Sequence, residues 1–369
     1  MKFLKALAVF LGTVIGVGIF GLPFVALRAG FFVVLLYFLF MALIVISINL
    51  IYGEVVLGSE KINRLPGHVE EYLGEKCKKI TFFVVTIGLM GALLAYLIIG
   101  GQFLNSSLGS YFGGGSTLYT LLFFILGAYL VLRGIKSISG IELFLLLLFF
   151  IILILFFVKA YPSIDIDNFK AFDLKYIVFP YGVILFSLWG SAVIPEIKEI
   201  VKGSKKELRK VIITGTIITI IVYLFFIYIV LGSSGIVSED AISGLEKTLG
   251  SNVIKLGFIF GVIACFTSFL TLGLTFKKVL WYDFGLDKNS AWFLTCFPPL
   301  ILFLLGIREF IRVISFTGAI ALGLEGIIIV FLYREFLKRK LSKKINPILY
   351  FLVGIFVLGI ILELVYFLW

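Results

Sequence analysis

Glycine and proline recur at one spacing in two distant apolar segments. Gly18 precedes Pro23 by five positions in GTVIGVGIFGLPF, and Gly190 precedes Pro195 by five positions in FSLWGSAVIP. Both residue types disfavour a helix, and a broken helix inside a membrane leaves backbone groups free to line a cavity. N–H groups at the start of a half-helix bind anions, whereas free carbonyls at the end of one suit an ammonium group or a metal cation. Together they fit an amino acid zwitterion.

Acidic side chains within apolar segments form a second group, because an ionisable residue there is a functional candidate. Glu325 lies deepest and is the best candidate for a proton relay. Glu196 follows Pro195 and is the second candidate for a proton relay; a role lining the inner pathway and a structural role are equally open for it. Three further carboxylates lie near the ends of their segments and are expected at the membrane interface: Glu54, Glu142 and Glu363. The single histidine, His68, is expected in a solvated loop, so no metal cluster is predicted around it.

These residues lie in a chain built mostly of long apolar runs. Of its 369 residues, 61% are hydrophobic and 14% are charged, whereas soluble domains carry about 25% charged residues. Runs of about 20 apolar residues cross a bilayer. We therefore expect an all-α membrane protein with about eleven spans, at 6–29, 31–57, 79–107, 116–134, 138–160, 175–201, 207–232, 252–279, 291–306, 314–333 and 346–367.

The charge distribution predicts the orientation. The chain has 32 Lys and Arg and a net charge of +11. With the N-terminus inside, 24 of the 32 fall in inner segments and 8 in outer ones, which is the positive-inside asymmetry. The N-terminus is therefore expected in the cytoplasm and the C-terminus outside, in the plasma membrane. The basic excess indicates contact with anionic inner-leaflet lipid and no nucleic-acid partner. The three cysteines predict no disulfide framework.

The two Gly–Pro segments are 172 residues apart. The first span begins at the inner face and the sixth at the outer face, so the breaks occur in helices of opposite direction. This pattern is typical of a five-plus-five inverted repeat around a midplane transport site. We expect one transporter domain (1–369) with a first repeat (1–160), a second (175–333) and an extra helix (346–367). Gly12 and Gly16 also form a GxxxG packing pattern, which is compatible with a break.

A secondary active transporter working by alternating access is therefore expected. An intramembrane enzyme or a receptor is a distant alternative. It would need a catalytic cluster or a large domain outside the membrane, and neither is recognisable in the sequence. The chain also lacks a P-loop for an ATP-driven pump.

Several segments resemble the hydroxy and aromatic amino acid permeases of the amino acid–polyamine–organocation superfamily, which has the leucine-transporter-type fold. The resemblance is carried by GTVIGVGIFGLPFVALRAGF, GALLAYLIIGGQFL, TSFLTLGLTFKKVLWYD and LTCFPPLILFLLGIREFI. PEIKEIVKGSKKELRKVIITGT is similar to this family and to the amino acid/auxin permeases. The resemblance implies amino acid import by ion-coupled symport, with exchange as an alternative.

The resemblance also implies the substrate-binding residues. The unwound segment whose amides hold the carboxylate matches Gly16, Val17, Gly18 and Ile19. The unwound segment whose carbonyls hold the amino group matches Phe186, Ser187, Leu188, Trp189 and Gly190, with Phe186 as a gating aromatic. Tyr96 falls where an aromatic hydroxyl faces the substrate.

A sodium site is implied in the same way, by Ala264, Thr267 and Ser268 with carbonyls at Gly12 and Ile15. Two hydroxyls and three carbonyls suit a hard cation, although such hydroxyls often bond to carbonyls of their own helix instead. The fifth span lacks the inner lysine of several proton-coupled relatives. Sodium is therefore slightly favoured over protons, with no other cofactor. The amino acid and the oligomeric state are not predicted.

Overall fold

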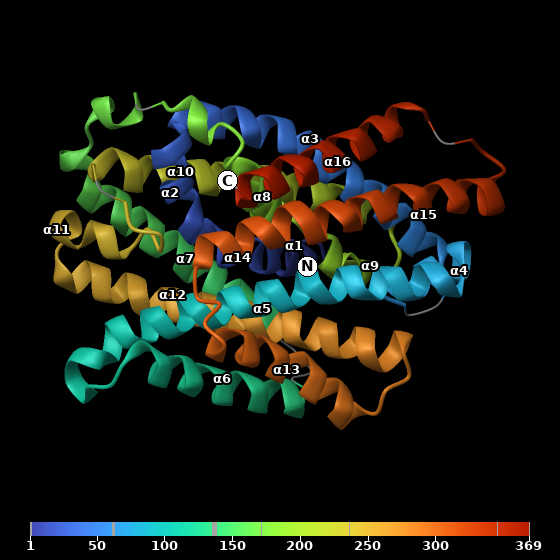
Figure 1. The fold of residues 1–369 in the computed structure, drawn as a ribbon, viewed down its shortest axis with the longest axis horizontal. Helices are drawn as coiled ribbons and strands as arrows, with labels where there is room; N and C mark the ends of the chain where they lie inside the picture. The colour runs from blue at the N-terminus through green and yellow to red at the C-terminus, as the bar shows by residue number, and fades with distance from the viewer. Residues whose placement is uncertain are drawn as a thin grey trace.

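The computed structural model describes residues 2–60, 63–134, 139–170, 172–235, 237–344 and 346–368, with the backbone alone at 139–143, 145, 247 and 368. Every regular element over these ranges is a helix. Most of the long helices run roughly along one direction and pack side by side (Figure 1). The all-α expectation is thus confirmed.

Eight helical segments of the described chain are long and apolar enough to cross a membrane, or nine if the bent pair α1 and α2 is one span. These segments contain α3 (Phe31–Gly58), α5 (Glu75–Phe112), α6 (Ser116–Arg133), α7 (Ser139–Ala160), α10 (Lys205–Ser233), α12 (Ser251–Lys278), α14 (Phe310–Phe316) joined to α15 (Gly323–Leu341), and α16 (Ile348–Leu368). The two other expected spans are shorter helices. The sixth is divided into α8 (Pro180–Leu188) and α9 (Ile194–Ile200), and the ninth is α13 (Lys288–Leu304). The count of eleven therefore stays a prediction.

The first span is broken, as the sequence predicts. α1 (Lys2–Val14) and α2 (Gly18–Ala29) meet at an angle of 53°. The break is shorter than expected, because Gly18 and Ile19 already belong to the first turn of α2. Glycine costs little at that position, since the first N–H groups of a helix have no partner within it.

The sixth span is also broken, but again over fewer residues than expected. Phe186, Ser187 and Leu188 form the last turn of α8, and the helix ends at Trp189 and Gly190. Nothing in the Phe-Ser-Leu triplet opposes a helix, so α8 continues until the glycine is near. A 3-10 turn (Ser191–Val193) leads into α9, whose first turn contains Pro195.

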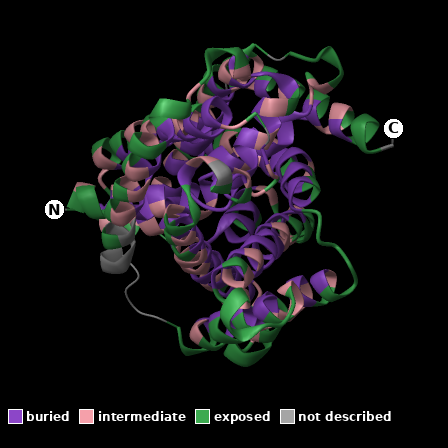
Figure 2. Cartoon of the chain, turned by 90° about the vertical axis from the view of Figure 1, so that its left-hand side faces the viewer, coloured by how far each residue is buried: buried purple, intermediate pink, exposed green. Residues whose placement is uncertain are grey.

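The broken helices lie in the interior, and the large exposed side chains outside are apolar. Buried residues line the inner faces of the helices and exposed residues lie at the periphery (Figure 2). On α3, Leu36 is 66% exposed and Leu43 is 69% exposed. Such a surface suits lipid contact. Cys265 and Cys296 are buried and Cys77 is partly exposed, all three as free thiols.

Two polar residues expected near solvent are buried instead. His68 is 1% exposed, because it lies on the short helix α4 (Leu65–Leu73), which packs against α5 and α15. Glu363 is 1% exposed and accepts a 2.5 Å hydrogen bond from the Ser315 hydroxyl. In both cases one covering element comes from a distant part of the chain: α15 for His68, and α14, which carries Ser315, for Glu363.

Candidate functional site

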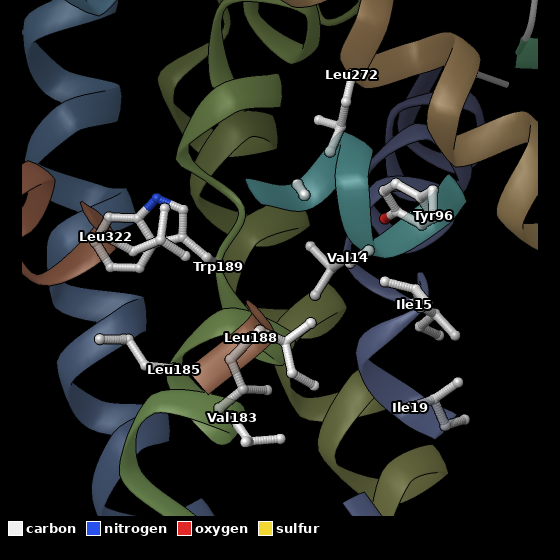
Figure 3. Packing of buried hydrophobic residues seen from close by; sticks show 14 of the residues in the cluster. Val14, Ile15, Ile19, Tyr96, Val183, Leu185, Leu188, Trp189, Leu272 and Leu322 are labelled. Atoms are coloured by element: carbon white, nitrogen blue, oxygen red, sulfur yellow. The ribbon is translucent and has the colours of Figure 1, made fainter. Parts of the chain in front are cut away.

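A cavity lies between the two helix breaks and is walled on its other sides by α5, α12 and α15. Figure 3 shows Val14 between Trp189 and Tyr96 in this region. Six of the ten residues expected at the substrate site line the cavity: Gly16, Gly18, Tyr96, Phe186, Ser187 and Trp189. Leu188 is fully buried and does not line it. Val17 and Gly190 lie in the breaks but do not line it, and Ile19 faces a neighbouring cavity.

The first break leaves backbone donors at the start of α2. Gly16 N–H turns back to the Val14 carbonyl at 2.8 Å, and Phe20 N–H bonds to the Val17 carbonyl at 3.1 Å. Among the described residues, the Gly18 N–H group has no carbonyl acceptor, and the Val17 N–H group donates to the Tyr96 hydroxyl oxygen instead. They lie at the positive end of the dipole of a 12-residue helix. This arrangement can bind a carboxylate.

Glycine is required at this break by close approach rather than by an unusual backbone angle. A Cβ on Gly16 would lie 2.2 Å from the Tyr96 hydroxyl oxygen. A Cβ on Gly18 would lie 2.4 Å from the Ser187 hydroxyl oxygen. The missing side chains therefore let α5 and α8 contact the broken backbone directly.

The second break is held by a side chain from another helix. The Glu325 carboxylate, buried on α15, accepts hydrogen bonds through Oε1 from the Trp189 indole N–H at 3.2 Å and from the Ser191 hydroxyl. The sequence singled out Glu325 for its depth but did not reveal that its partners are the residues of the break. The same side chain lines the central cavity.

Tyr223, on α10, joins the two breaks and was not predicted. Its hydroxyl is 2.6 Å from the Val14 carbonyl oxygen at the end of α1 and 2.9 Å from the Ser187 carbonyl oxygen near the end of α8. One hydroxyl hydrogen serves both acceptors, and the side chain is fully buried. The only signal in the sequence is a polar group in an apolar span, which many of the 16 tyrosines share.

The five residues expected to bind sodium line one cavity beside the first break: Gly12, Ile15, Ala264, Thr267 and Ser268. The Ser268 hydroxyl reaches across to the Gly12 carbonyl oxygen at 3.3 Å, which brings α12 against α1. The Thr267 hydroxyl bonds within its own helix, to the Ile263 carbonyl at 3.2 Å and the Ala264 carbonyl at 3.1 Å. The donor set is therefore all oxygen and uncharged, which suits a hard monovalent cation.

A network of charged side chains joins α9, the start of α4 and the end of α12 next to the second break. Glu196 on α9 forms an ion pair with Arg64 at 2.6 Å and lies 3.4 Å from the Lys278 ammonium. The Asp283 carboxylate accepts hydrogen bonds from the N–H groups of Arg64 and Gly67 at 3.2 and 3.1 Å, which fixes the start of α4. A small cavity separates Arg64 from Glu325. Glu196 is thus engaged with two cations, of which Arg64 lines this small cavity.

Comparisons with known proteins agree with this arrangement. A profile described as the tryptophan/tyrosine permease family matches residues 1–366. Tyrosine-specific transport system 1 of Haemophilus influenzae is 28% identical over 331 residues, which cover 83% of this chain and 81% of that protein. Tyrosine-specific transport system 2 of the same organism is 25% identical over 339 residues, with the same coverage of 83% and 81%.

Solved structures share the fold at low sequence identity. MhsT in complex with L-phenylalanine superposes with a TM-score of 0.69 at 18% identity, covering 99% of this chain and 98% of that one. The inward-facing conformation of Mhp1 gives a TM-score of 0.71 at 12% identity, covering 99% and 89%. These likenesses establish the leucine-transporter-type fold.

Proposed function

The chain belongs to the tryptophan/tyrosine permease family, and from this premise we propose that it imports an aromatic amino acid, such as tyrosine, by ion-coupled symport. Membership confirms the expectation of a membrane permease for amino acids rather than an enzyme. The transported amino acid, the ion and the residues that bind them belong to the proposal.

One observation carries the proposal: the first N–H group of one half-helix and the carbonyl ends of two others meet around one cavity. The substrate carboxylate binds at the Gly18 N–H group at the start of α2. The ammonium group binds among the carbonyls at the ends of α1 and α8, where the helix dipoles are negative. Phe186, Trp189 and Leu322 supply an apolar wall for the side chain.

Sodium is proposed as the coupling ion, bound by the carbonyls of Gly12, Ile15 and Ala264 and the hydroxyls of Thr267 and Ser268. The contact from Ser268 to the Gly12 carbonyl supports this choice, because it draws two of the five ligands together across helices. The cation would join α1 to α12 and so favour one arrangement of the broken span. This is how ion binding would couple to substrate movement.

Protons are the second candidate, and Glu325 favours them. This buried carboxylate lines both the central cavity and the smaller cavity toward Arg64, so it lies on a route between the substrate site and the α4 side. A proton on Glu325 would change its hydrogen bonds with Trp189 and Ser191, and with them the second break.

Uptake into liposomes distinguishes the two ions. Purified protein is tested with labelled tyrosine, tryptophan and phenylalanine, under a sodium gradient at equal pH and under a pH gradient without sodium. If sodium couples, Ser268→Ala and Thr267→Ala lower the apparent sodium affinity, whereas Glu325→Gln leaves sodium dependence intact. Full accumulation driven by the pH gradient alone would refute sodium coupling, and absence of uptake of any amino acid would refute the transport proposal.

The membrane arrangement is also part of the proposal. Eleven spans, with the N-terminus inside and the C-terminus outside the plasma membrane, place residues 1–160 and 175–333 as inverted repeats and 346–367 as an added helix. The two breaks, in α1/α2 and α8/α9, support alternating access around the central cavity. A reporter enzyme fused after the last residue should be active only outside the cytoplasm, and activity inside would exclude this topology.

A further inference from the structure

A separate cavity opens where α3 and α15 end and α10 begins, away from the proposed transport site. Its polar side is formed by Glu54, Lys205, Arg209 and Tyr333. Its apolar side is formed by leucines and isoleucines of α3 and α10, including Leu50, Leu57 and Ile212. A cavity with one charged edge and one apolar wall is the shape that an amphipathic ligand fills.

The charged edge of the cavity has more cationic groups than carboxylates. The Glu54 carboxylate is 2.7 Å from the Lys205 ammonium and accepts a 2.7 Å hydrogen bond from the Tyr333 hydroxyl. Lys205 has three N–H donors, so two remain for another acceptor. Arg209 forms no ion pair with a carboxylate within the described part of the chain. The edge therefore carries a net positive charge around a neutralised carboxylate.

The apolar wall continues along α3 as a row of leucines seven residues apart. Leu36, Leu43, Leu50 and Leu57 share one face of the helix at this spacing. Leu50 and Leu57 line the cavity, whereas Leu36 and Leu43 are 66% and 69% exposed on the lipid-facing surface. An acyl chain that starts in the cavity can therefore follow this face toward the middle of the helix.

The surroundings of the cavity attract anions. Segments 198–210 and 334–344 contain or directly follow the lining residues Lys205, Arg209 and Tyr333, and together they hold twelve Lys and Arg and three Glu. Anionic lipid binds such basic pockets between membrane helices, and each basic residue near the surface adds to the attraction.

We propose that this cavity binds one anionic phospholipid, with its phosphate between Lys205 and Arg209 and one acyl chain along the leucine face of α3. The site is distinct from the substrate and ion sites, so it is tested without measuring transport.

The test uses the purified full chain in neutral detergent, with fluorescent phosphatidylglycerol as the probe. Saturable binding at one lipid per chain is expected, with phosphatidylcholine competing weakly. Arg209→Gln should weaken phosphatidylglycerol binding about fivefold, from loss of one charge at the headgroup. Lys206→Gln is the matched control, because it removes the same charge from the same turn of α10 without lining the cavity.

Three results would overturn the proposal. Equal losses in Arg209→Gln and Lys206→Gln would mean that only the general surface charge attracts the lipid. Competition by soluble glycerol 3-phosphate as effective as that by the whole lipid would remove any role for the leucine face. Absence of saturable binding would remove the site altogether. Because both substituted residues are exposed, neither variant is expected to disturb folding.

Discussion

The two breaks share their Gly–Pro spacing, yet their backbones have different surroundings. At the first, only Ile15, Gly16 and Val17 separate the half-helices, and the Gly18 N–H group is left without a carbonyl acceptor among the described residues. At the second, Trp189 and Ser191 are held by the Glu325 carboxylate. The prolines differ too: Pro23 lies inside α2, whereas Pro195 starts α9.

The difference indicates that the two breaks have different roles. A break lined by glycine keeps its backbone groups available for a ligand, so the first break is the more direct binding element. The second break is hydrogen-bonded to a side chain of α15. We therefore expect its backbone to move together with α15. Tyr223 contacts one carbonyl from each and therefore connects the two.

The strongest test of the bare first break is Gly18→Leu. Its Cβ would lie 2.4 Å from the Ser187 hydroxyl oxygen, and the rest of the side chain would crowd the cavity. We expect tyrosine affinity to fall about 100-fold, as severe overpacking costs up to about 3 kcal/mol. Binding is measured by isothermal titration. Gly354→Leu is the control, because a Cβ there meets nothing within 4 Å. Unchanged affinity in Gly18→Leu would remove Gly18 from the site.

The supported second break is tested by Glu325→Ala beside Glu325→Gln. Alanine leaves the Trp189 N–H and the Ser191 hydroxyl without their acceptor, at about 1–3 kcal/mol for each unsatisfied donor. Glutamine retains an acceptor oxygen, so Glu325→Gln should lower the stability clearly less than Glu325→Ala. Thermal unfolding of both variants gives the comparison. Equal destabilisation would show that the charge of Glu325, rather than its hydrogen bonds, supports the break.

The connection between the breaks is tested by Tyr223→Phe, which leaves the Val14 and Ser187 carbonyls without the hydroxyl. A loss of about 1–2 kcal/mol in unfolding free energy is expected. The control is Tyr181→Phe, since the Tyr181 hydroxyl is buried without a hydrogen-bond partner among the described residues and its removal should cost little. Similar melting temperatures for the two variants would argue against a linking role for Tyr223.

The smallest expected effect is a change in the pH dependence of stability, and it concerns α4. Arg64, at the start of α4, joins this helix to the second break through its ion pair with Glu196. Burial, followed by the charges of Lys198 and Arg64, lowers the pKa of His68 from 6.5 to about 3. The unfolded chain therefore binds a proton that the folded chain excludes, so stability is full above about pH 6.5 and falls as the pH drops below it. Between about pH 7.5 and 5.5 the loss from this group is about 1.4 kcal/mol.

His68→Phe should remove that part of the pH dependence while other carboxylates and amines still titrate. Melting temperatures of both proteins at the two pH values isolate the contribution of the histidine. Parallel changes in both proteins would show that His68 becomes protonated without cost, and so that it is accessible to water.

The sequence predicted the breaks because glycine and proline act locally on the backbone. Their ends were placed wrongly by two or three residues, since a helix can begin at Gly18 and continue through Phe186, Ser187 and Leu188. Gly12, Thr267 and Ser268 line one cavity, and the sodium site that the resemblance implies there stays a prediction.

Contacts between distant elements could not be predicted. His68 was expected in solvent, although α5 and α15 cover its helix. Glu363 was expected at an interface, although Ser315 lies 48 positions earlier in sequence and bonds to it. Tyr223 looked like any other aromatic residue of an apolar span. In each case the side chain has its role through a partner that only the folded chain brings near.

The length of α5 has a mechanical consequence. Its 38 residues make a rod of about 57 Å, nearly twice the roughly 30 Å thickness of a bilayer's hydrocarbon core. A stiff rod cannot shorten, so a thinner bilayer is accommodated mainly by a change in its tilt. Tyr96 lies on this rod beside Gly16. A change in the tilt of α5 would therefore move Tyr96 against Gly16 and alter the geometry of the first break.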